Sequence, residues 1–578
     1  MLKKLMEKYK LDNAISLVLI LVSIYFLFRV IETNTVPFTW MCIIVSIIVI
    51  LSAIFIVLVF IKQPKWCHYI RRAFIFAFCG LLLYTSSIAS SYTISINKLS
   101  GDTTVNEFIS LISLKDNDDI KDIADLKGKK VAMQTGLDKE NSLFVKKKLK
   151  NEVKNIEFIE YKNNIDMTKD LLEGKIDAMI MSNKYIDLSI AEDPDFNKNM
   201  YIIKEYKRKI STNSSDSKKD ITKDTFTILI SGMDTYGDVD QIARNDVNMI
   251  VVVDPKTRHM EMISLPRDAF VPNMAYNQVP DKLTHTGLEG PDNTVATIEN
   301  FTGIDIDFYV SLNFQSLTDI VNTIGGIYVD VELDFCYYEE FEATPEENFC
   351  YKKGLQYFTG DDALRYSRCR KATGYGDPGR TRAQQRVLTG IMNKLITTEG
   401  IQRIDPLLAI LPDVVRTNLS ASQIQSFIKF QLEDISAWSM NSYTVDSSGA
   451  NLITASMPSY GPLSCMLLYK DSVQHLRNIY DYMNSDYDLS KFSFDYEGNK
   501  LPTVNKLKTP KNMYYFGDDV SAYEGEVNSG YESPSYPDNL PNDNPTTPPT
   551  PEVPDVDPTI PEETPTTPQE PQVPEVTG

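Results

Sequence analysis

The central part of the chain contains the stretch FTILISGMDTYGDVDQIARNDVNMIVVVDPKTRHMEMISLP, residues 226–266. Three apolar runs within it, at 226–232, 247–254 and 259–266, are typical of buried strands, and polar turns separate them. Further strands are expected at 306–313 and 325–333, alternating with amphipathic helices near 292–302, 314–324, 380–397 and 421–435. This alternation predicts a three-layer α/β/α domain over residues 225–484.

Three apolar runs precede this domain, within residues 1–96, at 14–31, 40–61 and 73–96. Each is close to the roughly 20 residues that a helix needs to cross a bilayer. They predict three transmembrane helices. No small-residue cleavage site follows the first run, so we expect it to remain in the mature protein and not to be removed as a signal peptide.

Positive charges flank these runs unevenly. The tail before the first run and the 62–72 loop are basic, whereas the 32–39 loop carries only Glu32. The positive-inside rule therefore places both basic segments in the cytoplasm. After three spans the rest of the chain would lie outside, which predicts a multi-pass protein of the cell membrane with an extracellular main domain.

The formal net charge of −20 at pH 7 argues against a nucleic-acid partner, because phosphate backbones are bound by clustered cations.

Residues 97–210 predict a small α/β unit between the membrane helices and the main domain. LKGKKVAMQTG (126–136) predicts a strand entering a turn, and DLLEGKIDAMIMSN (170–183) predicts a helix followed by a buried strand. Both phrases resemble one lobe of the bacterial extracellular solute-binding proteins. Because those proteins hold ligand between two lobes and only one is present, we expect a spacer or docking surface. Whether this accessory lobe binds a ligand stays open.

Polar segments separate and end these domains. Residues 211–224 lack an apolar period and predict a linker, and residues 485–527 form a C-terminal extension. From 528 to 578 the chain is mostly Pro, Thr, Glu and Asp. Such a composition buries too little apolar surface to offset the entropy of ordering, so we expect a disordered tail.

Four of the seven cysteines, Cys336, Cys350, Cys369 and Cys465, fall in the predicted extracellular domain, where thiols can be oxidised. Cys336 and Cys350 bracket an acidic insertion, which suggests a disulfide between them. A second bridge between Cys369 and Cys465 is also expected. No histidine accompanies them, so metal binding by these cysteines is disfavoured.

Arginines gather at predicted strand ends and turns of the main domain. ISLPRD (263–268) contains Arg267, ALRYSRCR (363–370) contains Arg368 and Arg370, and DPGRTRAQQ (377–385) contains Arg380. Arg368 and Arg370 share a face only if their segment is extended, whereas Arg380 and Gln384 share one on a helix. Several forked, permanently charged donors that converge on one point suit a pyrophosphate.

A pyrophosphate is commonly bound together with a divalent cation. Asp234 follows the first strand, and Asp246 lies two residues after Arg244. Magnesium is usually held by one or two protein carboxylates plus phosphate oxygens, so these two residues are candidate ligands for Mg²⁺ or Mn²⁺.

These motifs, taken in order, resemble the LytR-CpsA-Psr family: GMD, ARNDVNMIVVVDP, ISLPRD, DK with Lys282, GGIYVDV, ALRYSRCR and DPGRTRAQQ. The resemblance implies an enzyme that transfers a glycopolymer, such as a teichoic acid or capsular polysaccharide, from undecaprenyl pyrophosphate to peptidoglycan. It implies that Asp234 and Asp246 bind magnesium. It also implies a pyrophosphate site formed by Arg244, Arg267, Arg368, Arg370 and Arg380, assisted by Gln384.

Two departures from the family pattern are visible. Members often carry a further arginine shortly after the first aspartate, where this chain has Thr235 and Tyr236, and Cys369 lies between the paired arginines. One phosphate contact of the family is therefore absent from this sequence at that position.

The general base is not fixed by the sequence, because Asp268 and Asp377 are equally suitable candidates. An apolar slot for the polyprenyl chain is expected between the sheet and the 314–324 helix. Two other functions fit the same residues: a polyprenyl pyrophosphatase that uses water as acceptor, and a non-enzymatic envelope sensor or regulator. The sequence identifies no protein partner, no particular polymer and no oligomeric state.

Overall fold

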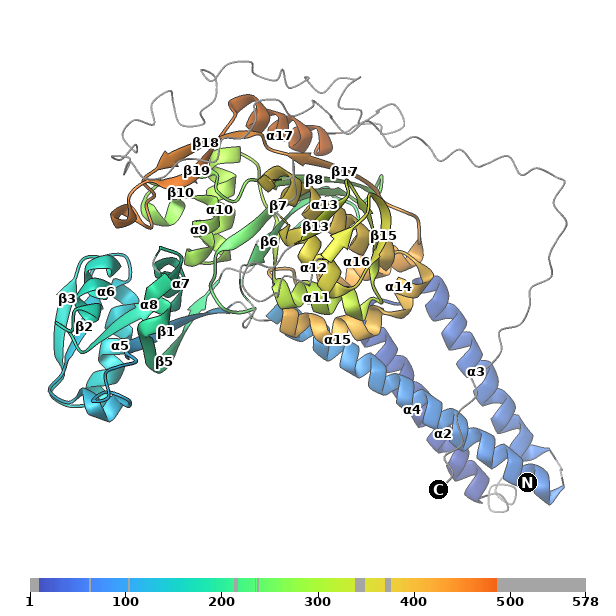
Figure 1. Cartoon of the computed structure of the whole chain (residues 1–578). Helices are drawn as coiled ribbons and strands as arrows, with labels where there is room; N and C mark the ends of the chain where they lie inside the picture. The colour runs from blue at the N-terminus through green and yellow to red at the C-terminus, as the bar shows by residue number, and fades with distance from the viewer. Residues whose placement is uncertain are drawn as a thin grey trace, which may run out of the picture. The chain divides into compact units, whose positions relative to one another are not determined.

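A computed structural model of the chain describes residues 10–485, except 62–63, 102–103, 193, 213–216, 234, 236–238, 338–348 and 370–375. Within that range the chain is a mixed α/β protein with three apolar N-terminal helices and two sheet-containing domains, as predicted (Figure 1). The expected disordered tail at 528–578, and nearly all of the 485–527 extension, lie outside the described residues.

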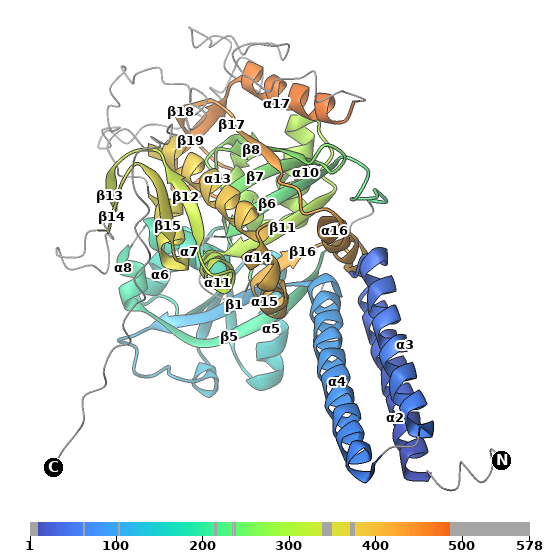
Figure 2. The same cartoon turned by 90° about the vertical axis from the view of Figure 1, so that its right-hand side faces the viewer.

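The N-terminal helices are α2 (Lys10–Thr33), α3 (Phe38–Phe60) and α4 (Lys65–Gly101). All three are long and apolar enough to cross a membrane, which confirms the three predicted spans by length and composition. The last turn of α4 contacts the main domain, since Leu99 is buried with Val414 and Val415 and Lys98 pairs with Asp413. Figure 2 shows the end of α4 beside α15 (Ile404–Val414).

The accessory lobe is built on a five-stranded sheet with the order β3-β2-β4-β1-β5. Strand β2 is parallel to β3 and β4, whereas β1 is antiparallel to β4 and β5. The predicted strand at 126–136 is β2, and the predicted helix and strand at 170–183 are the end of α6 and β4. The elements are β1 (Thr104–Leu114), η1 (Ile123–Leu126), β2 (Lys130–Gln134), α5 (Lys139–Glu152), β3 (Glu157–Tyr161), α6 (Asn164–Leu172), β4 (Ala178–Ser182), α7 (Asn183–Glu192), α8 (Pro194–Asn199) and β5 (Met200–Ser211).

The main domain contains a six-stranded sheet with the order β16-β11-β6-β7-β8-β17. Strand β11 is parallel to β6 and β17 is parallel to β8, while β7 is antiparallel to both β6 and β8. The strands are β6 (Phe226–Met233), β7 (Asn245–Asp254), β8 (His259–Leu265), β11 (Phe308–Asn313), β16 (Val415–Thr417) and β17 (Ser439–Thr444).

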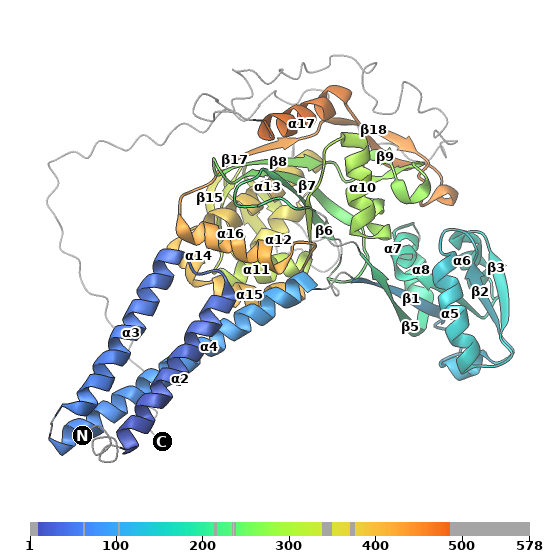
Figure 3. The ribbon, with the colours of Figure 1, turned by 180° about the vertical axis from the view of Figure 1, so that it is seen from behind.

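Helices cover both faces of this sheet, because its central strand β7 is apolar on both sides. Ile250 and Val252 pack in the cluster that holds Phe301 of α10 (Pro291–Thr302) and residues of α17 (Lys470–Met483). Met249 and Val251 point to the opposite face, in the cluster lined by α13 (Gly376–Leu395) and α16 (Ala421–Glu433). The predicted three-layer α/β/α architecture is therefore confirmed (Figure 3).

One predicted strand lies elsewhere. The 325–333 segment forms β12 (Ile327–Val331), which pairs with β15 (Gly354–Phe358) in a separate two-stranded ribbon and not in the central sheet. The reason is visible in its alternation: Val329 and Val331 are buried, whereas Tyr328 and Asp330 are exposed. A strand apolar on one face only does not fit a sheet covered on both faces.

The ribbon packs with α11 (Phe314–Thr323), α12 (Gly360–Arg368), α13 and α15 around a second core. The remaining elements are β9 (Phe270–Pro272), η2 (Met274–Tyr276), β10 (Pro280–Lys282), α9 (Leu283–Thr286), η3 (Gly287–Glu289), β13 (Phe335–Tyr337), β14 (Phe349–Tyr351), α14 (Thr398–Gln402), β18 (Ser447–Leu452), η4 (Pro458–Tyr460) and β19 (Leu463–Leu468).

The expected linker at 211–224 packs on the main domain in its second half. Ser217 and Lys219 both contact the carboxylate of Asp307 at 2.8 Å, and Ile221 is buried in the core beside the sheet.

The predicted bridge between Cys369 and Cys465 is wrong. Both residues are buried, reduced thiols in separate clusters, Cys369 beside the ribbon and Cys465 with Phe270 and Leu467. Their low exposure reflects apolar packing of a small side chain. Cys336 lies directly opposite Cys350 in the β13–β14 pair, and the bridge between them remains a prediction.

Candidate active site

Several of the predicted site residues lie at one edge of the central sheet. Strands β6, β8 and β11 all run in the same direction, because β7 is antiparallel to β6 and β8 while β11 is parallel to β6. Arg267 and Asp268 follow the end of β8, and Asp246 is the second residue of β7, which begins at the same edge. The crevice at the carboxyl ends of such strands is where α/β sheets commonly bind ligands.

Asp246 is the centre of this cluster. Its Oδ2 accepts a hydrogen bond from Arg267 Nη1 at 2.6 Å, and Thr284 Oγ1 donates to its Oδ1 at 3.4 Å. Burial alone would raise the pKa of Asp246, but Arg267, and then Arg380 and Arg244, outweigh it and hold the pKa below its ordinary value. The carboxylate is therefore ionised among three guanidinium groups.

Arg380 reaches the cluster from helix α13 and is only 5% exposed. A buried guanidinium is stable only beside anions, and Asp246 is one of them. A doubly charged pyrophosphate would add more negative charge at the same point. Gln384 lies one turn further along α13, so the prediction that Arg380 and Gln384 share a helix face is confirmed.

Asp268 is held between two cations. Lys282 Nζ lies 3.3 Å from its Oδ1 and Arg267 Nε lies 3.5 Å from its Oδ2. Its backbone carbonyl accepts a hydrogen bond from Met466 N at 2.7 Å, which fixes the segment after β8. The carboxylate is thus positioned at the site.

Arg368 ends helix α12 and stacks its guanidinium on Phe314, 4.4 Å from the ring centroid. Gln384 donates from Nε2 to the carbonyl of Ser367 at 3.2 Å, which joins α13 to the end of α12. Arg368 and Arg370 would share a face only in an extended segment. Arg368 instead lies in the last turn of a helix.

Several predicted residues cannot be placed. Asp234 and Arg370 lie outside the described residues, and so does the side chain of Asp377. The next residue after Asp234, Thr235, accepts a hydrogen bond on its carbonyl from Phe314 N at 3.3 Å. The chain following Asp234 therefore passes the first residue of α11, beside the ring that supports Arg368.

Thr284 and Phe314 were not among the predicted site residues. Thr284 follows the DK motif by two residues, and Phe314 begins a helix directly after β11. Phe314 could have been predicted as a site residue from its position directly after a strand that ends at the ligand edge.

The described residues contain no group of three or more His, Cys, Asp or Glu side chains that could hold a metal ion. At the candidate site, the ionised carboxylate of Asp246 and the hydroxyl of Thr284 beside it are possible metal ligands. This donor set fits a magnesium ion that takes most of its ligands from water and phosphate.

A cluster of arginines around a half-buried carboxylate, at the ligand edge of an α/β/α sheet, suits a phosphorylated ligand. Residues 196–461 match the model described as the LytR_cpsA_psr family, so this part of the chain is similar to that family. Residues 101–222 match the model described as NMT1/THI5 like, which supports the accessory lobe as a separate unit.

Two curated proteins of Bacillus subtilis strain 168 are similar to this chain. Polyisoprenyl-teichoic acid–peptidoglycan teichoic acid transferase TagV is 34% identical over 35% of this chain and 52% of its own length. The transferase of the same description, TagU, is 34% identical over 34% of this chain and 61% of its own length. The chain thus spans between about half and two thirds of the curated relatives it matches.

Among solved structures, the crystal structure of B. subtilis TagV is 27% identical and aligns with 46% of this chain and 99% of that chain, with a TM-score of 0.37.

Proposed function

We propose that this protein is a membrane-anchored phosphotransferase that moves a glycopolymer of the teichoic acid or capsular polysaccharide type from undecaprenyl pyrophosphate to peptidoglycan. The observation that carries the proposal is the arrangement of Arg267, Arg380 and Arg244 around the half-buried carboxylate of Asp246. The match of residues 196–461 to the LytR_cpsA_psr family model and the similarity to two teichoic acid transferases support the reaction type.

The chemistry requires charge neutralisation and positioning more than covalent participation by the protein. An acceptor hydroxyl of peptidoglycan attacks the phosphorus that carries the polymer. The bond from that phosphorus to the bridging oxygen breaks, undecaprenyl phosphate leaves, and a phosphodiester joins polymer and wall. Arg267 and Arg368 would bind the phosphate oxygens, and the hydroxyl proton would pass to a base, for which Asp268 and Asp377 remain the candidates.

Magnesium, or manganese in its place, would be held by Asp246 together with Asp234. When bound, the ion would neutralise charge on the pyrophosphate. Asp→Asn at either position should weaken metal dependence and turnover together, and added metal should restore part of the activity. If the two aspartates were instead an acid–base pair, the variants would change the pH profile and added magnesium would not help.

The position of the domain outside the cell rests on the three spans and on the uneven flanking charges. An apolar slot for the polyprenyl chain near α11 completes the proposal.

The proposal is tested by incubating the full chain in detergent micelles with a labelled lipid-linked glycopolymer, peptidoglycan and magnesium. Transfer should yield a wall-linked polymer with a phosphodiester, and undecaprenyl phosphate as the second product. Release of polymer phosphate without wall attachment would identify a polyprenyl pyrophosphatase instead. No turnover of any donor would favour a sensor or regulator.

A further inference from the structure

The accessory lobe contains a buried polar cluster at the carboxyl ends of its parallel strands β2 and β4. Asp138 accepts hydrogen bonds from Ser182 N at 2.9 Å and Asn141 Nδ2 at 2.8 Å. Ser182 Oγ donates to Glu107 Oε1 at 3.1 Å, and both carboxylates are buried. A cluster at this edge is where a lone lobe of this topology would bind a polar ligand.

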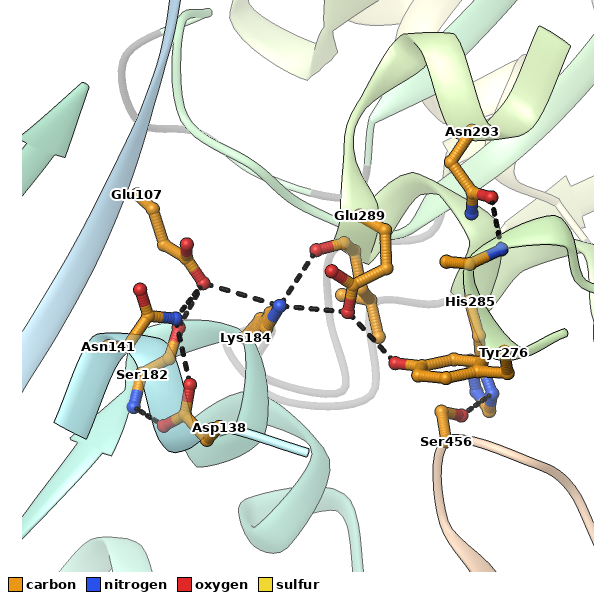
Figure 4. A network of polar contacts seen from close by, with 12 residues as sticks. Glu107, Asp138, Asn141, Ser182, Lys184, Tyr276, His285, Glu289, Asn293 and Ser456 are labelled. Atoms are coloured by element: carbon orange, nitrogen blue, oxygen red, sulfur yellow. Dashed lines mark hydrogen bonds and ion pairs between the residues drawn. The ribbon is translucent and has the colours of Figure 1, made fainter. Parts of the chain in front are cut away.

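Lys184 fills this cluster. Its buried Nζ lies 3.3 Å from Glu107 Oε1 within the lobe. The same nitrogen lies 2.9 Å from Glu289 Oε1 and donates to the Leu288 carbonyl at 3.1 Å, and both of these acceptors belong to the main domain (Figure 4). One ammonium group is therefore shared between acidic groups of two domains.

Apolar packing surrounds this shared ion pair. Leu288 and Met457 of the main domain are buried in the same cluster as Met181 and Ile186 of the lobe. Ser189 Oγ also lies 2.9 Å from Tyr460 Oη. These apolar contacts exclude water from the ion pair, as the contacts around a central buried residue do in a protein interface.

The segment that Lys184 contacts supports the candidate active site. Gly287 packs so closely on the residues flanking Arg244 that an added Cβ would lie 2.6 Å from Asn245 Cγ and 2.7 Å from the Ala243 carbonyl. Three residues earlier, Thr284 donates to the carboxylate of Asp246. A shift of residues 284–289 is thus transmitted directly to residues 243–246.

The lobe makes a second contact with the main domain, at residues 240–242, which precede Arg244 in the chain. In strand β1, Asn106 donates from its backbone N to the Asp240 carbonyl at 2.7 Å, and its carbonyl accepts from Ile242 N at 3.2 Å. This adds a β-bridge just before Arg244. The two lobe contacts therefore converge on residues 240–246.

We propose that the accessory lobe is a positioning domain for the phosphate site, docked through Lys184 and Asn106 onto the segments that hold Arg244 and Asp246. Lys184 occupies the polar cluster at the strand ends of the lobe, so the partner of that surface is segment 284–289 of the same chain. The proposal rests on the proposed function for its catalytic consequence only. Lys184 is a positioning residue and does not contact substrate.

Hydrogen exchange of the full chain in detergent micelles measures this docking without reference to activity. Lys184→Met should speed amide exchange in 240–246 and 284–290 by at least about tenfold, because removing one partner strands a buried charge. Glu289→Gln should do the same while exchange in β2 and β4 stays unchanged, which excludes an unfolded lobe as the cause. Lys175→Met, the same change in an exposed ion pair with Asp170, should leave all these amides as they are.

Kinetics then test the positioning role. Lys184→Met should raise the KM for the lipid-linked donor by about tenfold and leave the KM for peptidoglycan unchanged, because only the phosphate contacts depend on 240–246. Lys184→Arg, which keeps the charge, should recover part of the loss. Unchanged exchange at 240–246 in both Lys184→Met and Glu289→Gln would overturn the docking. A wild-type chain that shows the expected exchange but no transfer would overturn only the proposed function.

Discussion

Arg267→Ala is the change that most sharply tests the candidate site, because Arg267 both binds Asp246 and is proposed to bind phosphate. Removing one partner of a fully buried ion pair costs about 3–5 kcal/mol. Here the two side chains are 19% and 12% exposed, and Arg380 and Arg244 still act on the carboxylate. We therefore expect a loss of local stability of about 2 kcal/mol, less than the fully buried limit.

A double-mutant cycle separates this structural role from the catalytic one. Asp246→Asn removes the negative charge that Arg267 neutralises, so the double variant should recover about 1–2 kcal/mol relative to the sum of the single changes. Transfer should fall by about 10²–10³-fold in Arg267→Ala, the usual cost of losing one preorganised charge-stabilising donor, and the double variant should not recover it.

The assay is hydrogen exchange of β7 amides in parallel with transfer from the lipid-linked donor, since a multidomain chain has no single unfolding free energy. Stability changes that add within about 0.5 kcal/mol would show that Arg267 and Asp246 are not coupled. Wild-type turnover in Arg267→Ala would refute its phosphate role.

Three further predictions concern other parts of the chain. Arg368→Ala should lower transfer by about 10²-fold or more, whereas the matched Arg365→Ala on the same helix should stay within about threefold; equal losses would assign both arginines to folding. Burial raises the pKa of Asp138 to about 7 although Lys184 opposes it, so its protonated form is favoured in the folded lobe. The stability it contributes is complete below about pH 4 and is lost as the pH rises through about 7. The wild type should therefore lose lobe stability between about pH 4 and 7 relative to Asp138→Asn, and parallel curves would contradict this. Cys369 and Cys465 should react with an alkylating reagent only after unfolding, and a mass-mapped bridge between them would contradict their separate burial.

Much of the fold followed from the sequence because periodicity and length decide it. The strands at 226–232, 247–254 and 259–266 and the helix near 292–302 are present, since each is an unbroken apolar or amphipathic segment. The 325–333 segment was correctly predicted to be a strand, but it pairs with β15 and not with the central sheet. Pairing depends on which face of a strand is buried, and that choice is made by the whole domain.

The site was partly predictable for a different reason. Arg267, Asp246 and Arg380 were identified by type and motif, and the structure brings them together. The contact of the Phe314 ring with Arg368 was missed, because the position of Phe314 after β11 marks the ligand edge but does not show which distant residue it contacts. The bridge through Lys184 to Glu289 was missed for the same reason, since single lysines and glutamates are usually solvated surface residues.

The proposed pyrophosphate site can be tested by a crystal structure of the full chain with farnesyl pyrophosphate and Mn²⁺, located by the anomalous signal of manganese. We expect an anomalous peak beside Asp246, with phosphate oxygens within hydrogen-bond distance of Arg267 and Arg368. A pyrophosphate bound away from this edge of the sheet, for instance in the polar cluster of the accessory lobe in place of Lys184, would contradict it.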